Sequence, residues 1–444
     1  MSLIWTKYLP EFLRDKLEGR ESLQKGLHNT AWMMGDQVVR KLAGLLVWVL
    51  LARHFGPQLF GDYSYAIALV LIISPLAVLS LDAIAIRQLV KDPSQRDEII
   101  GTSFILMLVG GGVAYVLAMV TIFVIRPDGQ LVHWLVGIMS AGIVAQAFIA
   151  IEFWFESQMQ WQFTVYAKTS AFLLLSLVKV GLVLANASLI AIAWAGLAES
   201  VLGSVGLLLA YRYRGFSVKA WRFSRDMVKT LLSDSWPLMF SALLTMVYMR
   251  IDQIMLGNMA GSTELGNYSV AVQLSEAWYF IPMVIASSVM PAFVEVEKDN
   301  EDLFYAHLQR LYRIMALYSY LIAVPITFFA KDIVLFLFSS AYADAGPLAA
   351  IMIWVGVFTS LGAARNILIL VKNWTRIHLL SMALGCLLNI LLNLLLIPRY
   401  GAMGAVVATF ASYWFAIHGS CLLMKPLRKT GWMMIKAMVY PKVW

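Results

Sequence analysis

Charge is scarce in this sequence. Asp, Glu, Lys and Arg make up 14% of the 444 residues, whereas hydrophobic residues make up 61%. A water-soluble domain carries about 25% charged residues, so this chain has too little polar surface to cover such a domain. The composition excludes a soluble globular protein and predicts one that lies in a membrane.

Cysteine and the common catalytic motifs are also missing or rare. The two cysteines, Cys386 and Cys421, fall in separate apolar segments, which disfavours a disulfide framework or a thiolate metal site. The sequence has no G-x-x-x-x-G-K-[ST] phosphate loop, no His/Cys cluster with metal-ligand spacing, and no Ser or Cys with an evident base partner. We therefore expect no enzyme, no cofactor and no bound metal.

What the sequence does contain is a series of long apolar segments. A membrane-spanning helix needs about 20 mostly apolar residues, and this length predicts an all-α membrane protein with about twelve transmembrane helices. The predicted spans cover residues 30–53, 61–86, 99–125, 131–156, 165–185, 188–211, 232–257, 266–290, 305–329, 346–371, 377–397 and 402–424.

The basic residues predict the orientation of these spans. With both termini in the cytoplasm, most Lys and Arg residues fall in inner loops or at inner helix ends, and only Arg53, Arg126, Lys331 and Arg399 remain outside. This asymmetry follows the positive-inside rule. The net charge of +8 is then explained by contact with anionic membrane lipids, so nucleic acid is not an expected partner.

An internal repeat divides the chain into two halves. The segment LARHFGPQLFGDYSYA at 51–66 returns as LGNMAGSTELGNYSVA at 256–271, with six identical positions that include Gly56/Gly261 and Gly61/Gly266. Six spans precede the basic connector, so the halves run in parallel and are related by a pseudo-two-fold axis along the membrane normal. The predicted domains are an amphipathic N-terminal segment at 1–28, a first six-helix bundle at 29–211, a connector at 212–230, a second bundle at 231–424 and a basic tail at 425–444.

Several Lys and Arg residues lie deep in predicted spans. Inserting a charged side chain there costs at least about 2.5–3.5 kcal/mol, so such residues are candidates for a functional site. They come from both halves, and together they predict a cationic cavity that binds an anion such as a phosphate. The alternative is that each cation is neutralised by a nearby carboxylate, as the i, i+4 spacing of Asp36 and Arg40 suggests. The candidate substrate-binding residues are Arg40, Lys41, Lys179, Arg250 and Arg365.

The deep carboxylates are candidates for ion coupling. Glu152 and Glu156 are one helical turn apart, and two like carboxylates in a low-dielectric site cannot both ionise cheaply. The alternative is that Glu156 is hydrated at the inner interface while Glu152 pairs with a lysine of the next helix. The ion-coupling candidates are Glu152, Glu156, Glu199, Glu276 and Asp252.

Short motifs resemble a known family of membrane transporters. The stretch YMRIDQIMLG at 248–257, followed by Gly261 and GNYS at 266–269, resembles the R-x-D-x-x-x-L-G … G … L-G-x-Y pattern of Wzx-type oligosaccharide flippases. Gly56 with GDY at 61–63, Pro291, and PRYGAMGA at 398–405 resemble further landmarks. These flippases are polysaccharide transporters of the multidrug/oligosaccharidyl-lipid/polysaccharide (MOP) exporter superfamily.

The resemblance implies a protein of the bacterial inner membrane that flips undecaprenyl-pyrophosphate-linked oligosaccharide repeat units by alternating access, coupled to a proton or Na+ gradient. A polysaccharide polymerase and a chain-length regulator are further partners that such a protein can have. The polymer is left open among O-antigen of lipopolysaccharide, capsule and exopolysaccharide. Two alternatives remain: a cation-coupled small-molecule or drug exporter of the same superfamily, and a membrane scaffold.

Overall fold

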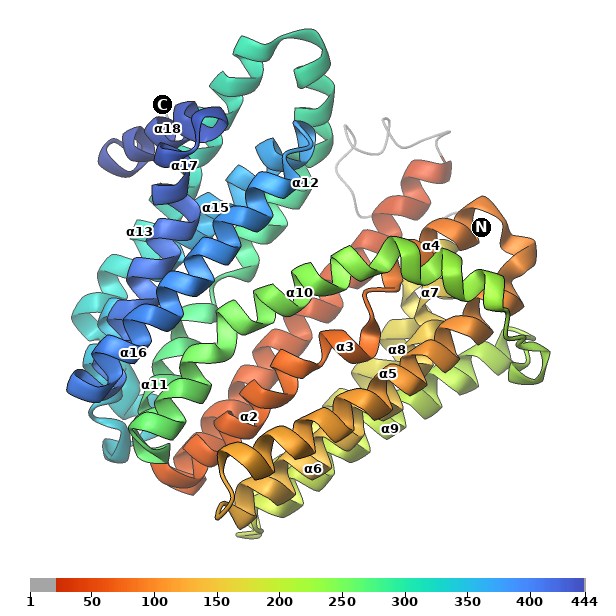
Figure 1. Ribbon diagram of the computed structural model, residues 1–444, viewed down its shortest axis with the longest axis horizontal. Helices are drawn as coiled ribbons and strands as arrows, with labels where there is room; N and C mark the ends of the chain where they lie inside the picture. Colours follow the sequence, from red (N-terminus) through yellow and green to blue (C-terminus); the bar gives the residue numbers. More distant parts are fainter. Residues whose placement is uncertain (1–20, 443–444) are drawn as a thin grey trace. The chain divides into compact units, whose positions relative to one another are not determined.

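The computed structural model describes residues 21–442, with side chains described from residue 32 onward except at 298 and 299. Most of the predicted N-terminal segment at 1–28 therefore lies outside the described residues. Every regular element in the described part of the chain is a helix. The α-helices (Figure 1) are α2 (Glu21–Ile73), α3 (Pro75–Val78), α4 (Asp82–Lys91), α5 (Arg96–Ile125), α6 (Gln130–Ala145), α7 (Ala150–Ser157), α8 (Trp161–Leu184), α9 (Leu189–Tyr213), α10 (Arg225–Met259), α11 (Ser262–Glu276), α12 (Phe280–Asp299), α13 (Glu301–Phe338), α14 (Ala345–Met352), α15 (Val355–Val371), α16 (Thr375–Trp414), α17 (Ser420–Leu423) and α18 (Arg428–Val439). A π-helix, η6 (Phe415–Gly419), links α16 to α17.

Ten helical segments in the described chain are long and apolar enough to cross a membrane. Two of them, Trp32–Lys91 and Thr375–Leu423, are 60 and 49 residues long, far more than the roughly 20 residues that cross a bilayer. Each contains a glycine with non-helical dihedral angles, Gly56 in the first and Gly401 in the second. Each of these two segments thus contains two of the predicted spans. The other eight segments contain one span each, so the ten segments together account for the twelve predicted spans.

Contacts on either side of these glycines show that the chain reverses there. The rings of Trp48 and Phe60 lie 4.3 Å apart, although twelve residues of straight helix would separate them by about 18 Å. Around Gly401, the side-chain amide of Asn389 donates to the hydroxyl of Ser412 at 3.1 Å. Asn389, which itself accepts from Asn393 at 2.9 Å, thus joins the legs of a hairpin, as expected for polar groups that hold membrane helices together.

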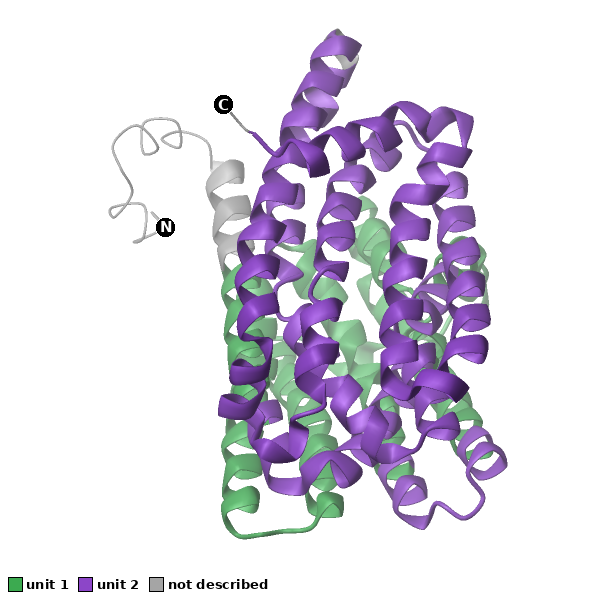
Figure 2. Ribbon diagram, turned by 90° about the vertical axis from the view of Figure 1, so that its left-hand side faces the viewer, with its two compact units in different colours: residues 1–47, 73–120, 137–240 green, residues 48–72, 121–136, 241–444 purple. Residues whose placement is uncertain are grey.

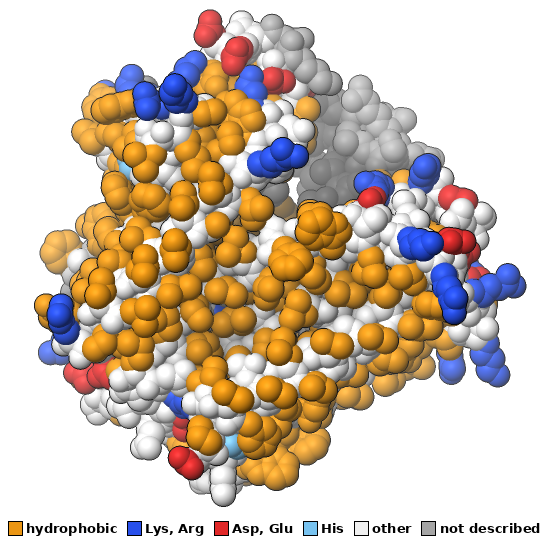
Figure 3. All heavy atoms as spheres, in the orientation of Figure 1, with side chains coloured by type: hydrophobic (Ala, Val, Ile, Leu, Met, Phe, Trp, Pro, Cys, Tyr) orange, Lys and Arg blue, Asp and Glu red, His pale blue; other side chains and the backbone are white. Residues whose placement is uncertain are grey.

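The described chain packs into two compact units (Figure 2). Unit 1 contains the residues up to Val47, Ile73–Val120 and Gly137–Phe240, and unit 2 contains Trp48–Ile72, Thr121–Val136 and the chain from Ser241 onward. These units follow packing, whereas the bundles at 29–211 and 231–424 follow the repeat, so the predicted domain boundaries stay a prediction. Apolar side chains cover most of the face in Figure 3, and Lys and Arg gather near α18 and near α4.

The two copies of the repeat meet inside unit 2 through their glycines. Gly56 and Gly261 both have positive φ, 71° and 92°, and each lies where one span ends and the next begins. A Cβ on Gly61 would collide with the backbone of Ser262, and a Cβ on Gly266 would collide with the backbone of Pro57. Since Pro57 and Ser262 are themselves equivalent in the repeat, the contact is self-complementary, as a two-fold axis requires.

This close approach predicts an unusual response to a small substitution. Gly→Ala inside a helix normally stabilises it by up to about 1 kcal/mol. At Gly61 we expect Gly61→Ala to destabilise the protein by about 1–3 kcal/mol, because the added methyl group overpacks the contact with Ser262. Thermal unfolding of the purified protein measures the change.

The matched control is Gly181→Ala in α8, where an added Cβ meets no atom within 4 Å. We expect this variant to unfold at or above the wild-type temperature. A Gly61→Ala protein that is as stable as the Gly181→Ala protein would contradict the helix contact.

Candidate functional site

In unit 1, two of the three cations of the predicted cavity, Arg40 and Lys179, are paired with carboxylates. Arg40 Nε donates to Asp36 Oδ1 at 2.8 Å within α2, which confirms the pair expected from their spacing. Lys179 Nζ in α8 donates to Glu199 Oε2 in α9 at 2.8 Å. Lys41 forms no ion pair with any residue that the structure describes.

Glu152 and Glu156 have different surroundings. Glu152 is buried and lies 2.8 Å from the Nζ of Lys168, on the helix that follows. Glu156 is only half-buried. The sequence allowed two interpretations of these carboxylates. The structure agrees with the one in which Glu152 pairs with a lysine of the next helix.

A polar cavity of about 300 Å³ lies inside unit 1. Its wall includes Arg40, Lys168 and Glu199, together with the hydroxyl residues Ser200 and Ser204. Since the three charged residues come from α2, α8 and α9, tertiary packing brings them together. This cavity joins charges that the sequence had placed on separate spans.

In unit 2, Arg250 and Asp252 on α10 make separate contacts. Arg250 Nη2 donates to Glu276 Oε2 at 2.9 Å, and both side chains are largely shielded, with 17% and 16% exposed. Asp252 is 3% exposed and accepts hydrogen bonds from Tyr268 and from Thr409 Oγ1, the latter at 3.1 Å. Residues two apart point to different sides of a helix, so Arg250 pairs with Glu276 and not with Asp252.

Among the residues that the structure describes, no lysine or arginine forms an ion pair with Asp252 within 4 Å, and Arg250 acts on it only from a longer distance. Its hydrogen bonds come from two hydroxyl groups and the backbone N–H of Gln253, at 2.7 Å for the last. Burying an ionised carboxylate is costly unless a positive charge compensates it. Asp252 is thus a buried carboxylate whose hydrogen-bond donors are all neutral, and its role in ion coupling stays a prediction.

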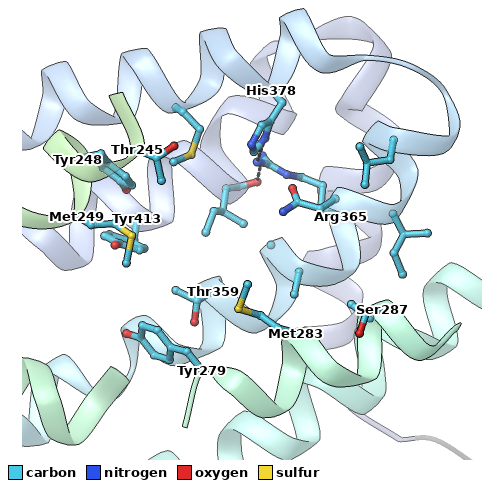
Figure 4. Close-up of a pocket in the computed structure, with 18 of the residues that line it drawn as sticks. Thr245, Tyr248, Met249, Tyr279, Met283, Ser287, Thr359, Arg365, His378 and Tyr413 are labelled. Atoms are coloured by element: carbon cyan, nitrogen blue, oxygen red, sulfur yellow. Dashed lines mark hydrogen bonds between the residues drawn. The ribbon is translucent and has the colours of Figure 1, made fainter. Parts of the chain in front are cut away.

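Arg365 is held by backbone and imidazole groups. It is 1% exposed, and its Nη1 donates to the carbonyl oxygens of Ala416 and Ile417 at 3.0 and 2.9 Å. Its Nη2 lies 3.3 Å from Nδ1 of His378. Both Arg365 and His378 line a cavity of about 540 Å³ within unit 2 (Figure 4).

Three residues that contact the charged groups of the candidate site were not predicted from the sequence. His378 lies in an apolar helix without a motif, and Tyr268 belongs to the repeat, where it was treated as a structural landmark. Thr409 lies on the far leg of the α16 hairpin, 157 residues from Asp252. No local spacing reveals such a contact. Among the described residues, no group of three or more His, Cys, Asp or Glu side chains could hold a metal ion.

Structural comparison places this fold among known transporters. The chain is similar to an inward-facing multidrug resistance MATE family transporter of the MOP superfamily (TM-score 0.69, 14% identity, covering 88% of this chain and 96% of that one). It is also similar to the lipid II flippase MurJ in an inward closed conformation (0.65, 14%, 94% and 91%). A third similar structure is a MOP superfamily transporter from Pyrococcus furiosus, described as having a binding pocket of reverse polarity (0.60, 13%, 91% and 96%). The chain therefore shares its fold with these membrane transporters.

Two family models match parts of the sequence. Residues 27–297, more than half of the chain, match the family described as "Polysaccharide biosynthesis protein", and residues 237–395 match the MatE family. The chain belongs to the polysaccharide biosynthesis protein family. A sequence comparison with curated proteins finds no match. The family and the fold are those of transporters and not of enzymes.

Proposed function

We propose that this protein flips polyprenyl-pyrophosphate-linked oligosaccharide repeat units across the bacterial inner membrane by alternating access, with both termini in the cytoplasm. The observation that carries the proposal is the family match over residues 27–297. The deep cations support it, because a pyrophosphate is a multiply charged anion that guanidinium groups bind through paired hydrogen bonds. The cavity formed by Arg40, Lys41, Lys179, Arg250 and Arg365 stays a prediction.

The ion pairs suggest how binding and release alternate. Arg250 has Glu276 at 2.9 Å, and Lys179 has Glu199 at 2.8 Å. A phosphate oxygen and a carboxylate compete for the same N–H donors, so the substrate exchanges with the carboxylate. Arg250 and Lys179 then each have an anionic partner both with and without substrate, which avoids an uncompensated buried charge.

Ion coupling is assigned to Asp252 in this proposal. A proton or Na+ that binds at Asp252 alters the charge on α10, two residues from Arg250. Glu276 lies directly against that arginine, so the affinity of Arg250 for phosphate depends on the charge that this region carries. The cation gradient is thereby linked to release of the substrate.

A gene deletion tests the proposal in cells. We expect the deletion strain to lose its surface polysaccharide while lipid-linked repeat units accumulate on the inner leaflet, and a plasmid copy of the gene to restore display. A deletion strain with normal display and no accumulation would contradict flipping as the function.

The second candidate is a cation-coupled exporter of small molecules. The MatE match over residues 237–395 favours it, as does the likeness to multidrug resistance transporters. Such an exporter would bind cationic compounds through carboxylates such as Glu199 or Glu276. Its loss would raise sensitivity to cationic dyes and leave surface polysaccharide intact, which is the opposite of the first proposal on both counts.

A further inference from the structure

The cavity inside unit 2 has the dimensions of a site for a small molecule. Its volume is about 540 Å³, and cavities that bind small ligands cover about 300–1,000 Å³. Side chains from α10, α12, α15, α16 and the π-helix η6 line it. In Figure 4, Arg365 and His378 lie on one side of this space, and Tyr279 and Met283 lie on the facing side.

Most of the cavity wall is apolar and adaptable. Four methionines line it, and Tyr248, Tyr279 and Tyr413 add aromatic surface. Methionine is unbranched and polarisable, so a wall rich in it adjusts to apolar ligands of variable shape. This part of the cavity suits a hydrocarbon body rather than a sugar. The four methionines are Met249, Met283, Met290 and Met382.

One part of the wall carries a buried positive charge without a counter-ion. Arg365 is always protonated, and no carboxylate among the described residues forms an ion pair with it. Its Nε has no hydrogen-bond partner in the described structure. Isolated buried charge is expensive, so an anion bound beside Arg365 would be strongly favoured.

The local backbone holds this arginine in place. Ala416 and Ile417, whose carbonyl oxygens accept from Nη1, belong to the π-helix η6. π-Helical turns are rare in proteins, and those that do occur are often found at functional sites. The acceptors fix the guanidinium but leave its positive charge uncompensated, because carbonyl oxygens carry only partial charges.

We infer that this cavity binds an amphiphilic anion, with its hydrocarbon body against the methionines and tyrosines and its phosphate or carboxylate head group at Arg365. A neutral lipid would leave Arg365 without an anion, and an inorganic anion would leave the apolar wall unfilled. The ligand comes from one of two sources, the prenyl phosphate part of a translocated lipid or a free fatty anion of the membrane. With the prenyl phosphate as ligand, the inference rests on the proposed function, which already counts Arg365 among the substrate-binding residues. With a free fatty anion as ligand, it stands apart from that function, because an exporter of small molecules would retain the same cavity.

Binding to the full-length protein in nanodiscs tests this inference without glycan and without transport. The probe is radiolabelled farnesyl phosphate, and empty nanodiscs give the background from partition into lipid. We expect saturable binding that farnesol, which has no charge, and pyrophosphate, which has no hydrocarbon body, displace at least about tenfold less well than unlabelled farnesyl phosphate. Laurate that displaces the probe equally well identifies free fatty anions as a source, whereas a strong preference for farnesyl phosphate identifies the prenyl phosphate.

Two substitutions locate the site. Arg365→Gln removes the charge, and we expect the affinity for farnesyl phosphate to fall at least about tenfold towards that for farnesol. Ala363→Phe keeps the arginine and fills part of the cavity that Ala363 lines, and we expect it to lower binding of farnesyl phosphate and farnesol alike. The controls are Arg399→Gln and Val407→Phe, which make the same changes at exposed positions of unit 2.

Two results would overturn the inference. One is equal affinity for farnesyl phosphate and farnesol in the wild-type protein, which would mean that no cation contributes. The other is unchanged binding in Ala363→Phe, which would place the ligand elsewhere even if Arg365→Gln fails to fold. Neither result bears on whether the protein flips oligosaccharide lipids, because the assay contains no transport step.

Discussion

Arg250→Gln is expected to lower export of the lipid-linked oligosaccharide by about tenfold to a hundredfold. A hydrogen bond to a charged group contributes about 1.5–3 kcal/mol, and each 1.4 kcal/mol changes an equilibrium about tenfold. The neutral amide loses both the charge and the paired donors that a phosphate requires. Export by vesicles that contain equal amounts of each variant measures the effect.

Two further variants separate binding from structure. Arg250→Lys keeps the charge but loses the planar donor pair, and we expect it to retain part of the export. Arg399→Gln removes one positive charge from an exposed position, and we expect wild-type export. Full export by a correctly inserted Arg250→Gln protein would remove Arg250 from the substrate site.

Asp252→Asn is expected to abolish the dependence of transport on the cation gradient. For one cation per substrate, a tenfold gradient supplies about 1.4 kcal/mol and raises accumulation about tenfold. The amide retains the size of the side chain and can still accept from Tyr268 and Thr409, but it carries no charge for a proton or Na+ to compensate. Initial rates with proton and Na+ gradients imposed separately identify the ion.

The matched control for Asp252 is Glu295→Gln, which removes a carboxylate at an exposed position of α12. We expect this variant to respond to the gradient like the wild type. A tenfold rise in accumulation that persists in Asp252→Asn would exclude this carboxylate as the coupling site and turn attention to Glu276 and Glu199.

The sequence predicted those parts of the structure that depend on local pattern. The lengths of the apolar segments predicted the twelve spans. The structure agrees because the two longest helices each reverse at a glycine and so contain two spans each. The repeat marked Gly61 and Gly266, because only residues without a side chain allow the backbones to approach so closely. The pair of Asp36 and Arg40 followed from helical spacing alone.

The rest of the candidate site depends on packing between distant segments. The sequence indicated that Lys179 and Arg250 were expensive to bury, but their carboxylate partners lie 20 and 26 residues away on neighbouring helices. The surroundings of Arg365 depend on a π-helix 50 residues further along the chain. No sequence motif predicts this π-helix. The position of a charged residue deep in a predicted span indicates that its burial must be compensated. Only the three-dimensional structure shows which residue compensates it.

The most direct test of the central claim is translocation by the purified protein alone. Proteoliposomes would contain this chain and a fluorescent polyprenyl-pyrophosphate oligosaccharide, and a membrane-impermeant glycosidase would report how much of the glycan reaches the outer leaflet. The account predicts translocation that a cation gradient accelerates and that Arg250→Gln slows by about tenfold or more. Glycan that stays on its original leaflet in wild-type proteoliposomes, at the level of protein-free liposomes, would contradict it.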